Sequence, residues 1–147
     1  ADFIALLADN FSVNLSYGWQ DGEYDSVNPA FADFLGPELP RLAPTNYSLG
    51  FSWDIRVGSG LINVMANHSY REGHPYDDAN NQNFEDQRRT NASVNWFSEN
   101  DAWNVALYGK NLEDEANWGN LTSIAGLWVA GPMKKGREYG LEINFRY

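Results

Sequence analysis

The sequence contains no cysteine, few basic residues and no long apolar run. The absence of cysteine excludes a disulfide scaffold, a thiolate metal site and a cysteine nucleophile. The 10 Lys and Arg residues, set against 20 Asp and Glu, form no clustered stripe, which disfavours a nucleic-acid partner. No stretch approaches the roughly 20 apolar residues that a membrane-spanning helix requires. A helical membrane protein is therefore excluded.

Aromatic residues are abundant, at 15% of the chain, although the mean hydropathy is only -0.53. They occur in segments where apolar and polar residues alternate with period two, which places successive side chains on opposite faces of a strand. Seven segments show the pattern: 1–7, 11–20, 47–57, 62–71, 90–96, 103–107 and 139–147. We therefore expect about seven strands, the last of them running to the final residue.

The expected connections alternate between tight and long. Short turns fall at 8–10, 57–60 and 98–102, and long polar loops fall at 21–44, 72–87 and 113–136. An antiparallel meander with short turns at one rim and long loops at the other is typical of a transmembrane barrel whose short turns face the periplasm. Bacterial single-chain barrels have an even number of strands, so seven indicates that further strands come from elsewhere.

Alternation alone does not separate a lipid-facing sheet from one that covers a soluble core. The expected strands, however, run to roughly ten residues, the length that a tilted transmembrane strand needs. Their polar positions are mostly Asn, Ser and Gly. We predict an all-β protein, an antiparallel meander forming part of a transmembrane outer-membrane β-barrel. Tyr47, Phe51 and Ile143 should contact lipid, and Leu49→Arg should impair insertion where Ser48→Arg does not.

The end of the chain carries two motifs. Residues 103–115, WNVALYGKNLEDE, contain an Asn-Leu-x-Asp element, and residues 131–147, GPMKKGREYGLEINFRY, contain an Arg-x-Tyr-Gly element followed by a closing aromatic. The motif positions are Asn111, Leu112, Asp114, Arg137, Tyr139, Gly140 and Tyr147. In motif, spacing and terminal position this region resembles the closing strands of TonB-dependent receptors.

That resemblance implies a role in ligand uptake across the outer membrane of a Gram-negative bacterium. The imported ligand would be an iron chelate, cobalamin or a glycan, with energy supplied by the TonB complex through a plug domain. Residues 1–147 would be the C-terminal strands of the barrel, with the plug domain and the earlier strands provided by other residues or another chain. The resemblance implies no cofactor.

The alternating apolar residues of the last segment are the first candidate functional set. The resemblance implies that they form a signal read by the barrel assembly machinery, although they would also face lipid in any barrel. The residues are Tyr139, Leu141, Ile143, Phe145 and Tyr147.

The loop at 71–87 has the polar and aromatic content of an external ligand-contacting loop, although a purely solvated loop has a similar composition. The candidate ligand residues are Arg71, His74, Tyr76, Asp77 and Asp78. His68 and His74 match no metal-ligand spacing, so no metal site is expected. The acidic run at 113–115 has no histidine or nucleophile nearby in sequence, so no catalytic residue is expected and the protein is not predicted to be an enzyme.

Two alternatives remain open from the sequence. The first is a small self-contained outer-membrane barrel with a structural or adhesive role, closed by an eighth strand within residues 21–44. The second is a soluble β-sandwich that binds carbohydrate through exposed tryptophans. An even strand count would favour the first, and solubility without detergent would favour the second.

Overall fold

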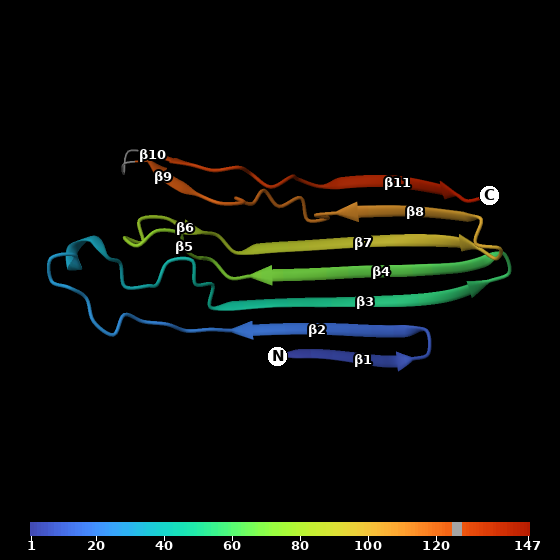
Figure 1. Cartoon of the computed structure of the whole chain (residues 1–147), viewed down its shortest axis with the longest axis horizontal. Helices are drawn as coiled ribbons and strands as arrows, with labels where there is room; N and C mark the ends of the chain where they lie inside the picture. The colour runs from blue at the N-terminus through green and yellow to red at the C-terminus, as the bar shows by residue number, and fades with distance from the viewer. Residues whose placement is uncertain (125–127) are drawn as a thin grey trace.

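The computed structural model describes residues 1–124 and 128–147. Its main feature is a seven-stranded antiparallel sheet with the strand order β1, β2, β3, β4, β7, β8, β11 (Figure 1). The strands are β1 (Asp2–Ala8), β2 (Phe11–Trp19), β3 (Thr45–Val57), β4 (Gly60–Arg71), β7 (Gln87–Ser98), β8 (Trp103–Lys110) and β11 (Glu138–Phe145). The predicted antiparallel meander is therefore confirmed, and each strand pairs with the next long strand along the chain.

The end of the last strand differs from the prediction. β11 stops at Phe145, which pairs with Trp103, the first residue of β8. The backbone N–H of Arg146 still donates a hydrogen bond to the carbonyl of Ala102, at 2.9 Å. Tyr147 therefore lies beyond the strand rather than within it.

All three tight turns lie at one end of the sheet, and the three long loops leave from the other (Figure 1). We call this second end the loop-bearing rim. The loops contain short elements that alternation did not predict, because each is only two or three residues long. They are η1 (Ala32–Phe34), β5 (His74–Pro75), β6 (Asn83–Phe84), β9 (Thr122–Ile124) and β10 (Trp128–Ala130).

The strand register separates two chemically different faces. On the apolar face, Trp53, Val64, Val94, Leu107 and Leu141 form one continuous row across five strands. The opposite, polar face carries small amide and hydroxyl groups. A row on this face runs through Asn14, Gly50, Asn67 and Asn91.

Hydrogen bonds between neighbouring strands satisfy the side chains of the polar face. Asn63 donates to the hydroxyl of Ser52 at 3.0 Å and to the carboxylate of Asp54 at 2.6 Å. Asn67 donates to the hydroxyl of Ser48 at 2.9 Å. Cross-strand amide and hydroxyl pairs of this kind stabilise a sheet without an apolar cover.

The apolar face, by contrast, has no second layer of protein among the described residues. Leu107 and Ile143 remain 58% and 57% exposed. The core cluster of buried residues lies in the loops instead, and consists of Tyr76, Phe84 and Leu121 with Val129 packed against it. A β-sandwich would bury the apolar face of the large sheet against another sheet. The described part of the chain therefore does not support the sandwich alternative.

The alternative of a self-contained eight-stranded barrel also lacks its eighth strand. Within residues 20–44, all of them described, the only regular element is the 3-10 helix η1. No helix among the described residues has the length and apolar character needed to cross a membrane. The sheet remains open, with β1 and β11 at its two edges (Figure 1).

Candidate functional site: the loop-bearing rim

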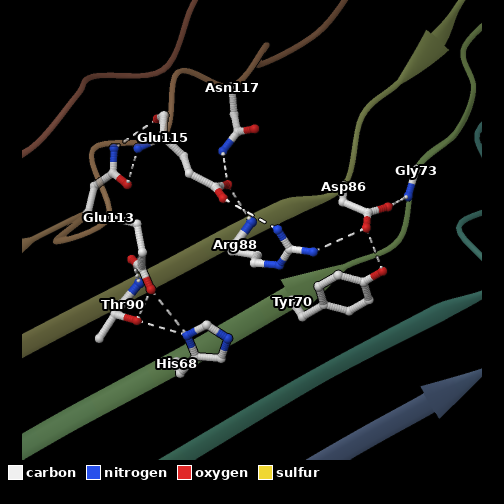
Figure 2. A network of polar contacts seen from close by, with 10 residues as sticks. His68, Tyr70, Gly73, Asp86, Arg88, Thr90, Glu113, Glu115 and Asn117 are labelled. Atoms are coloured by element: carbon white, nitrogen blue, oxygen red, sulfur yellow. Dashed lines mark hydrogen bonds and ion pairs between the residues drawn. The ribbon is translucent and has the colours of Figure 1, made fainter.

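Charged side chains gather on both faces of the sheet at the loop-bearing rim. On the apolar side, two cross-strand pairs join the end of β4 to the start of β7: His68 with Thr90, and Tyr70 with Arg88. These pairs and three loop carboxylates form a polar network (Figure 2). The network consists of His68, Tyr70, Asp86, Arg88, Thr90, Glu113 and Glu115.

Asp86 closes the loop between β4 and β7. Its carboxylate accepts hydrogen bonds from the backbone N–H of Gly73 at 2.9 Å and from the hydroxyl of Tyr70 at 3.0 Å (Figure 2). Its Oδ2 also lies 3.4 Å from the guanidinium of Arg88. The Gly73 hydrogen bond, followed by that of Tyr70, lowers the pKa of the Asp86 carboxyl. Asp86 therefore holds the two ends of the loop together while it is ionised.

Glu113 and Glu115 take over backbone hydrogen bonding where β8 ends. The pairing of β7 with β8 stops at Ala92, which leaves the N–H groups of residues 88 and 90 without a strand partner. Glu115 accepts the N–H of Arg88 at 2.8 Å, and Glu113 accepts the N–H of Thr90 at 2.7 Å and also its hydroxyl. The Thr90 hydroxyl is the main cause of a lowered pKa at Glu113. These carboxylates fix the following loop to the edge of β7.

The Asn-Leu-x-Asp element supplies the turn between β8 and this loop. Asn111 is 2% exposed and has a positive φ of 52°. Its side-chain amide donates to the carbonyls of Glu115 at 2.9 Å and Lys135 at 3.3 Å, and its oxygen accepts the N–H of Glu115 at 3.2 Å. Asp114 accepts the N–H of Arg137 at 2.8 Å, just before β11. The two motifs seen in the sequence therefore meet in space.

On the polar side of the rim lies a different group, which we call the basic cluster: Arg71, Arg89, Lys110 and Lys134. On the polar face, Arg71 ends β4, Arg89 lies near the start of β7 and Lys110 ends β8. Lys134 comes from the last long loop and lines a hollow with Arg71 and Arg89. The Lys134 ammonium donates to the side-chain oxygen of Gln87 at 2.9 Å. Partial burial, and then the positive charges of Arg89 and Arg71, lower the pKa of Lys134.

Three members of the basic cluster, Arg89, Lys110 and Lys134, line a hollow of ≈ 580 Å³ together with Lys135 and Glu138. A second, smaller hollow of ≈ 140 Å³ shares Arg89 and Lys134 with it. Such concavities are where proteins place the polar groups that orient a ligand. The rim therefore offers a positively charged recess on the polar side of the sheet.

Of the candidate loop residues, Arg71 is the one that joins the recess. His74 is buried, and its Nδ1 donates to the carbonyl of Glu72 at 3.0 Å. Burial lowers the pKa of His74. The Tyr76 ring is buried edge-on against Phe84, with ring centres 6.2 Å apart. These two side chains build the core of the loop rather than its surface.

The two candidate aspartates lie in the turns of the same loop. The Asp77 carboxylate accepts the N–H of Asn81 at 3.1 Å, and the carbonyl of Asp78 accepts the N–H of Gly36 at 2.7 Å. The second contact joins two long loops. Ligand contact by these five loop residues stays a prediction.

Residues Arg89, Lys110 and Lys134 were not singled out from the sequence. Arg89 follows Arg88 and Lys134 precedes Lys135 in the sequence, but only the register and the fold of the last loop bring Arg89, Lys110 and Lys134 together. The candidate assembly signal lies on the edge strand β11. Its residues Tyr139 and Phe145 project from the apolar face of that strand and are 70% and 56% exposed. Its role stays a prediction.

Long antiparallel strands with short turns at one end and long loops at the other are the arrangement found in the walls of transmembrane barrels. Two solved structures share this fold. The ferric yersiniabactin uptake receptor FyuA from Yersinia pestis matches 97% of this chain with a TM-score of 0.81 and 15% identity. The siderophore receptor PiuA from Acinetobacter baumannii matches 98% with a TM-score of 0.76 and 18% identity.

These matches confirm the predicted fold, that of a barrel portion of TonB-dependent receptors. The chain spans 22% of the FyuA chain and 20% of the PiuA chain, about a fifth of each. No protein-family model matches the sequence. No curated protein matches it either.

Proposed function

We propose that this chain forms part of the barrel wall of an outer-membrane receptor that imports a scarce ligand into the periplasm. The observation that carries the proposal is a sheet of long strands whose apolar face is covered by none of the described residues, while its other face carries hydrogen-bonded amide and hydroxyl groups. Lipid on the apolar side and water on the polar side satisfy both faces. The host membrane is the outer membrane of a Gram-negative bacterium.

The two ends of the sheet support one orientation in that membrane. The tight turns face the periplasm, and the loop-bearing rim faces the cell exterior. Tyr47 and Tyr70 stack at a centroid distance of 5.1 Å beside the rim, where an aromatic girdle would meet the lipid headgroups. Arg88 lies in the same row as this pair, and Glu113 contacts Thr90 one row further from the rim, so the polar network lies at the level of this girdle.

The edges of the sheet require partners in this setting. Each unpaired backbone group costs several kcal/mol in hydrocarbon, and the free edges of β1 and β11 expose several such groups each. We propose that strands from other residues or from a second polypeptide close the barrel, and that a plug domain outside this chain connects it to TonB. The apolar residues of β11, with Tyr147, would serve the barrel assembly machinery.

Among the three ligand classes, the similarity favours an iron chelate, because one solved structure is by name a ferric yersiniabactin uptake receptor and the other a siderophore receptor. Cobalamin and glycans remain the other members of the class. Cells that depend on the receptor for iron should accumulate radiolabelled iron from a chelate, and cells in which the gene is deleted should not. Equal accumulation in the two strains would contradict the transport role.

A size measurement tests the barrel role separately. The protein should be extracted from outer membranes with detergent and its mass measured by sedimentation, with the detergent contribution subtracted. We expect a particle several times heavier than 16.6 kDa, or this chain as part of a longer polypeptide. A lone monodisperse 16.6 kDa species would contradict closure by other strands.

A further inference from the structure

We propose that the basic cluster of Arg71, Arg89, Lys110 and Lys134 binds the anionic groups of the ligand, so that the receptor selects a negatively charged chelate over a neutral one. This inference rests on the proposed function and narrows its substrate class. It starts from the position of the cluster. In the register, Arg89 lies opposite Ser69 and Arg71 lies opposite Gln87, so both follow the polar face.

The basic cluster differs from the other cations of the rim in having no carboxylate partner. Arg88 pairs with Asp86, Lys135 pairs with Glu138 at 3.0 Å, and Arg137 lies 3.8 Å from Asp114. Within residues 1–124 and 128–147, no salt bridge involves any of the four members of the basic cluster.

This gap is notable in a chain with 20 acidic residues and a net charge of -10. Glu138 is the one carboxylate that lines the larger hollow. It lies opposite Lys110 in the register, and its carboxylate accepts a hydrogen bond from Lys135 at 3.0 Å. Like charges without counter-ions repel one another, and after partial burial the charges of Arg89 and Arg71 contribute to the lowered pKa of Lys134. An arriving anion relieves that repulsion and gains charge-assisted hydrogen bonds, which are planar and two-pronged for arginine.

The face of the sheet on which the basic cluster lies favours a soluble ligand over a lipid headgroup. Phosphates of membrane lipids approach from the apolar side, where Tyr47, Tyr70 and Arg88 lie. The basic cluster lies on the opposite side, which becomes the barrel interior under the proposed function. A charged group of a small ligand that enters the barrel from outside reaches it first.

Equilibrium dialysis with two radiolabelled iron complexes tests the inference on the complete receptor in detergent. One probe is a ferric tris-catecholate complex, which is a trianion, and the other is a neutral ferric tris-hydroxamate complex. The test variant combines Arg89→Gln and Lys134→Gln. The matched control combines Arg56→Gln and Arg146→Gln, which removes the same charge without touching the basic cluster.

We expect wild type and the matched control to bind the trianion more tightly than the neutral probe. Two lost charge-assisted hydrogen bonds should weaken trianion binding by about a hundredfold in the test variant, and neutral-probe binding should stay constant. A third variant, with Arg89→Lys and Lys134→Arg, keeps the charge and should retain most of the preference. Retention of the folded, heat-modifiable band shows that each variant is intact.

Three results would overturn the inference: equal affinity of wild type for the two probes, no binding of the trianion, or equal losses in the test variant and the matched control. Iron uptake by cells separates this from the proposed function. If cells take up both iron complexes equally well, the anion site is contradicted but the receptor role is supported. If the receptor binds the trianion selectively but cells take up no iron, the anion site is supported and the transport role is contradicted.

Discussion

The substitution Val94→Arg places a cation at the centre of the apolar face. Val94 lies in the middle of β7, pairs with Val64 and Leu107 across the neighbouring strands and is 44% exposed. A cation at the bilayer midplane of a barrel costs about 2–4 kcal/mol, and the cost falls to about 0–1 kcal/mol near the interface. We therefore expect Val94→Arg to lower the ratio of folded to unfolded protein by about 30-fold to 1,000-fold.

Two further substitutions turn this prediction into a test of side and depth. Ser93→Arg lies next to Val94 along the strand, at nearly the same depth but on the polar face, and should cost little. Leu49→Arg lies on the apolar face but pairs with His68 near the rim, so its guanidinium can reach the headgroups. Its cost should fall between the other two.

The assay is reversible unfolding of the complete barrel in lipid vesicles, followed by tryptophan fluorescence as a function of denaturant. Extrapolation to zero denaturant gives the free energy of unfolding of each variant. We expect the loss of stability to follow the order Val94→Arg, Leu49→Arg, Ser93→Arg. Equal losses at Val94 and Ser93 would refute the assignment of the two faces.

Three other perturbations address the turns and the rim. Gly60→Ala should destabilise the protein by at least about 1 kcal/mol, because Gly60 has a φ of 141° and an added Cβ would meet the carbonyl of Phe97. Gly58→Ala is the control, because a Cβ at Gly58 meets no atom within 4 Å. Equal melting temperatures of the two variants would refute this prediction. Asn111→Ala should cost about 1–3 kcal/mol, because it removes the hydrogen bonds of a buried side chain to Glu115 and Lys135. It should also increase hydrogen exchange at Glu115 and in residues 135–137, and unchanged exchange would argue against this role. Asp86 has a lowered pKa in the folded state, so its contribution to stability is complete above its ordinary pKa of about 3.9 and is lost as the pH falls through the folded-state pKa. Hydrogen exchange in residues 72–86 should therefore rise only below about pH 4. A rise near neutral pH would contradict the direction of this pKa shift.

The long strands could be predicted from the sequence because their side chains face two different environments. Alternation survives in each strand wherever one face is apolar and the other polar, as in the run from Tyr47 to Val57. β1 shows the limit of this signal. Ile4 and Leu6 lie on the polar side in the register, opposite Asn14 and Ser12, so apolar residues occupy both faces there.

The rim could be predicted only in part. The motif residues Asn111 and Asp114 were visible as a resemblance, but their hydrogen bonds to the start of β11 depend on how a long loop folds back. His74 and Tyr76 looked like surface ligands because they lie in a polar segment, yet the β5–β6 hairpin buries them. The basic cluster draws on three strands and a loop, and no local pattern connects those four positions.

The absence of cysteine allows one measurement to test the central claim directly. Single cysteines introduced along β3, from Tyr47 to Val57, can be spin-labelled in the complete barrel in vesicles, and collision with lipid-soluble oxygen compared with collision with a water-soluble nickel complex. We expect oxygen access to dominate at 49, 51, 53 and 55 and nickel access to dominate at 48, 50, 52 and 54. A profile without this period of two, or odd positions shielded from both reagents by other protein, would contradict a wall with lipid on one side and water on the other.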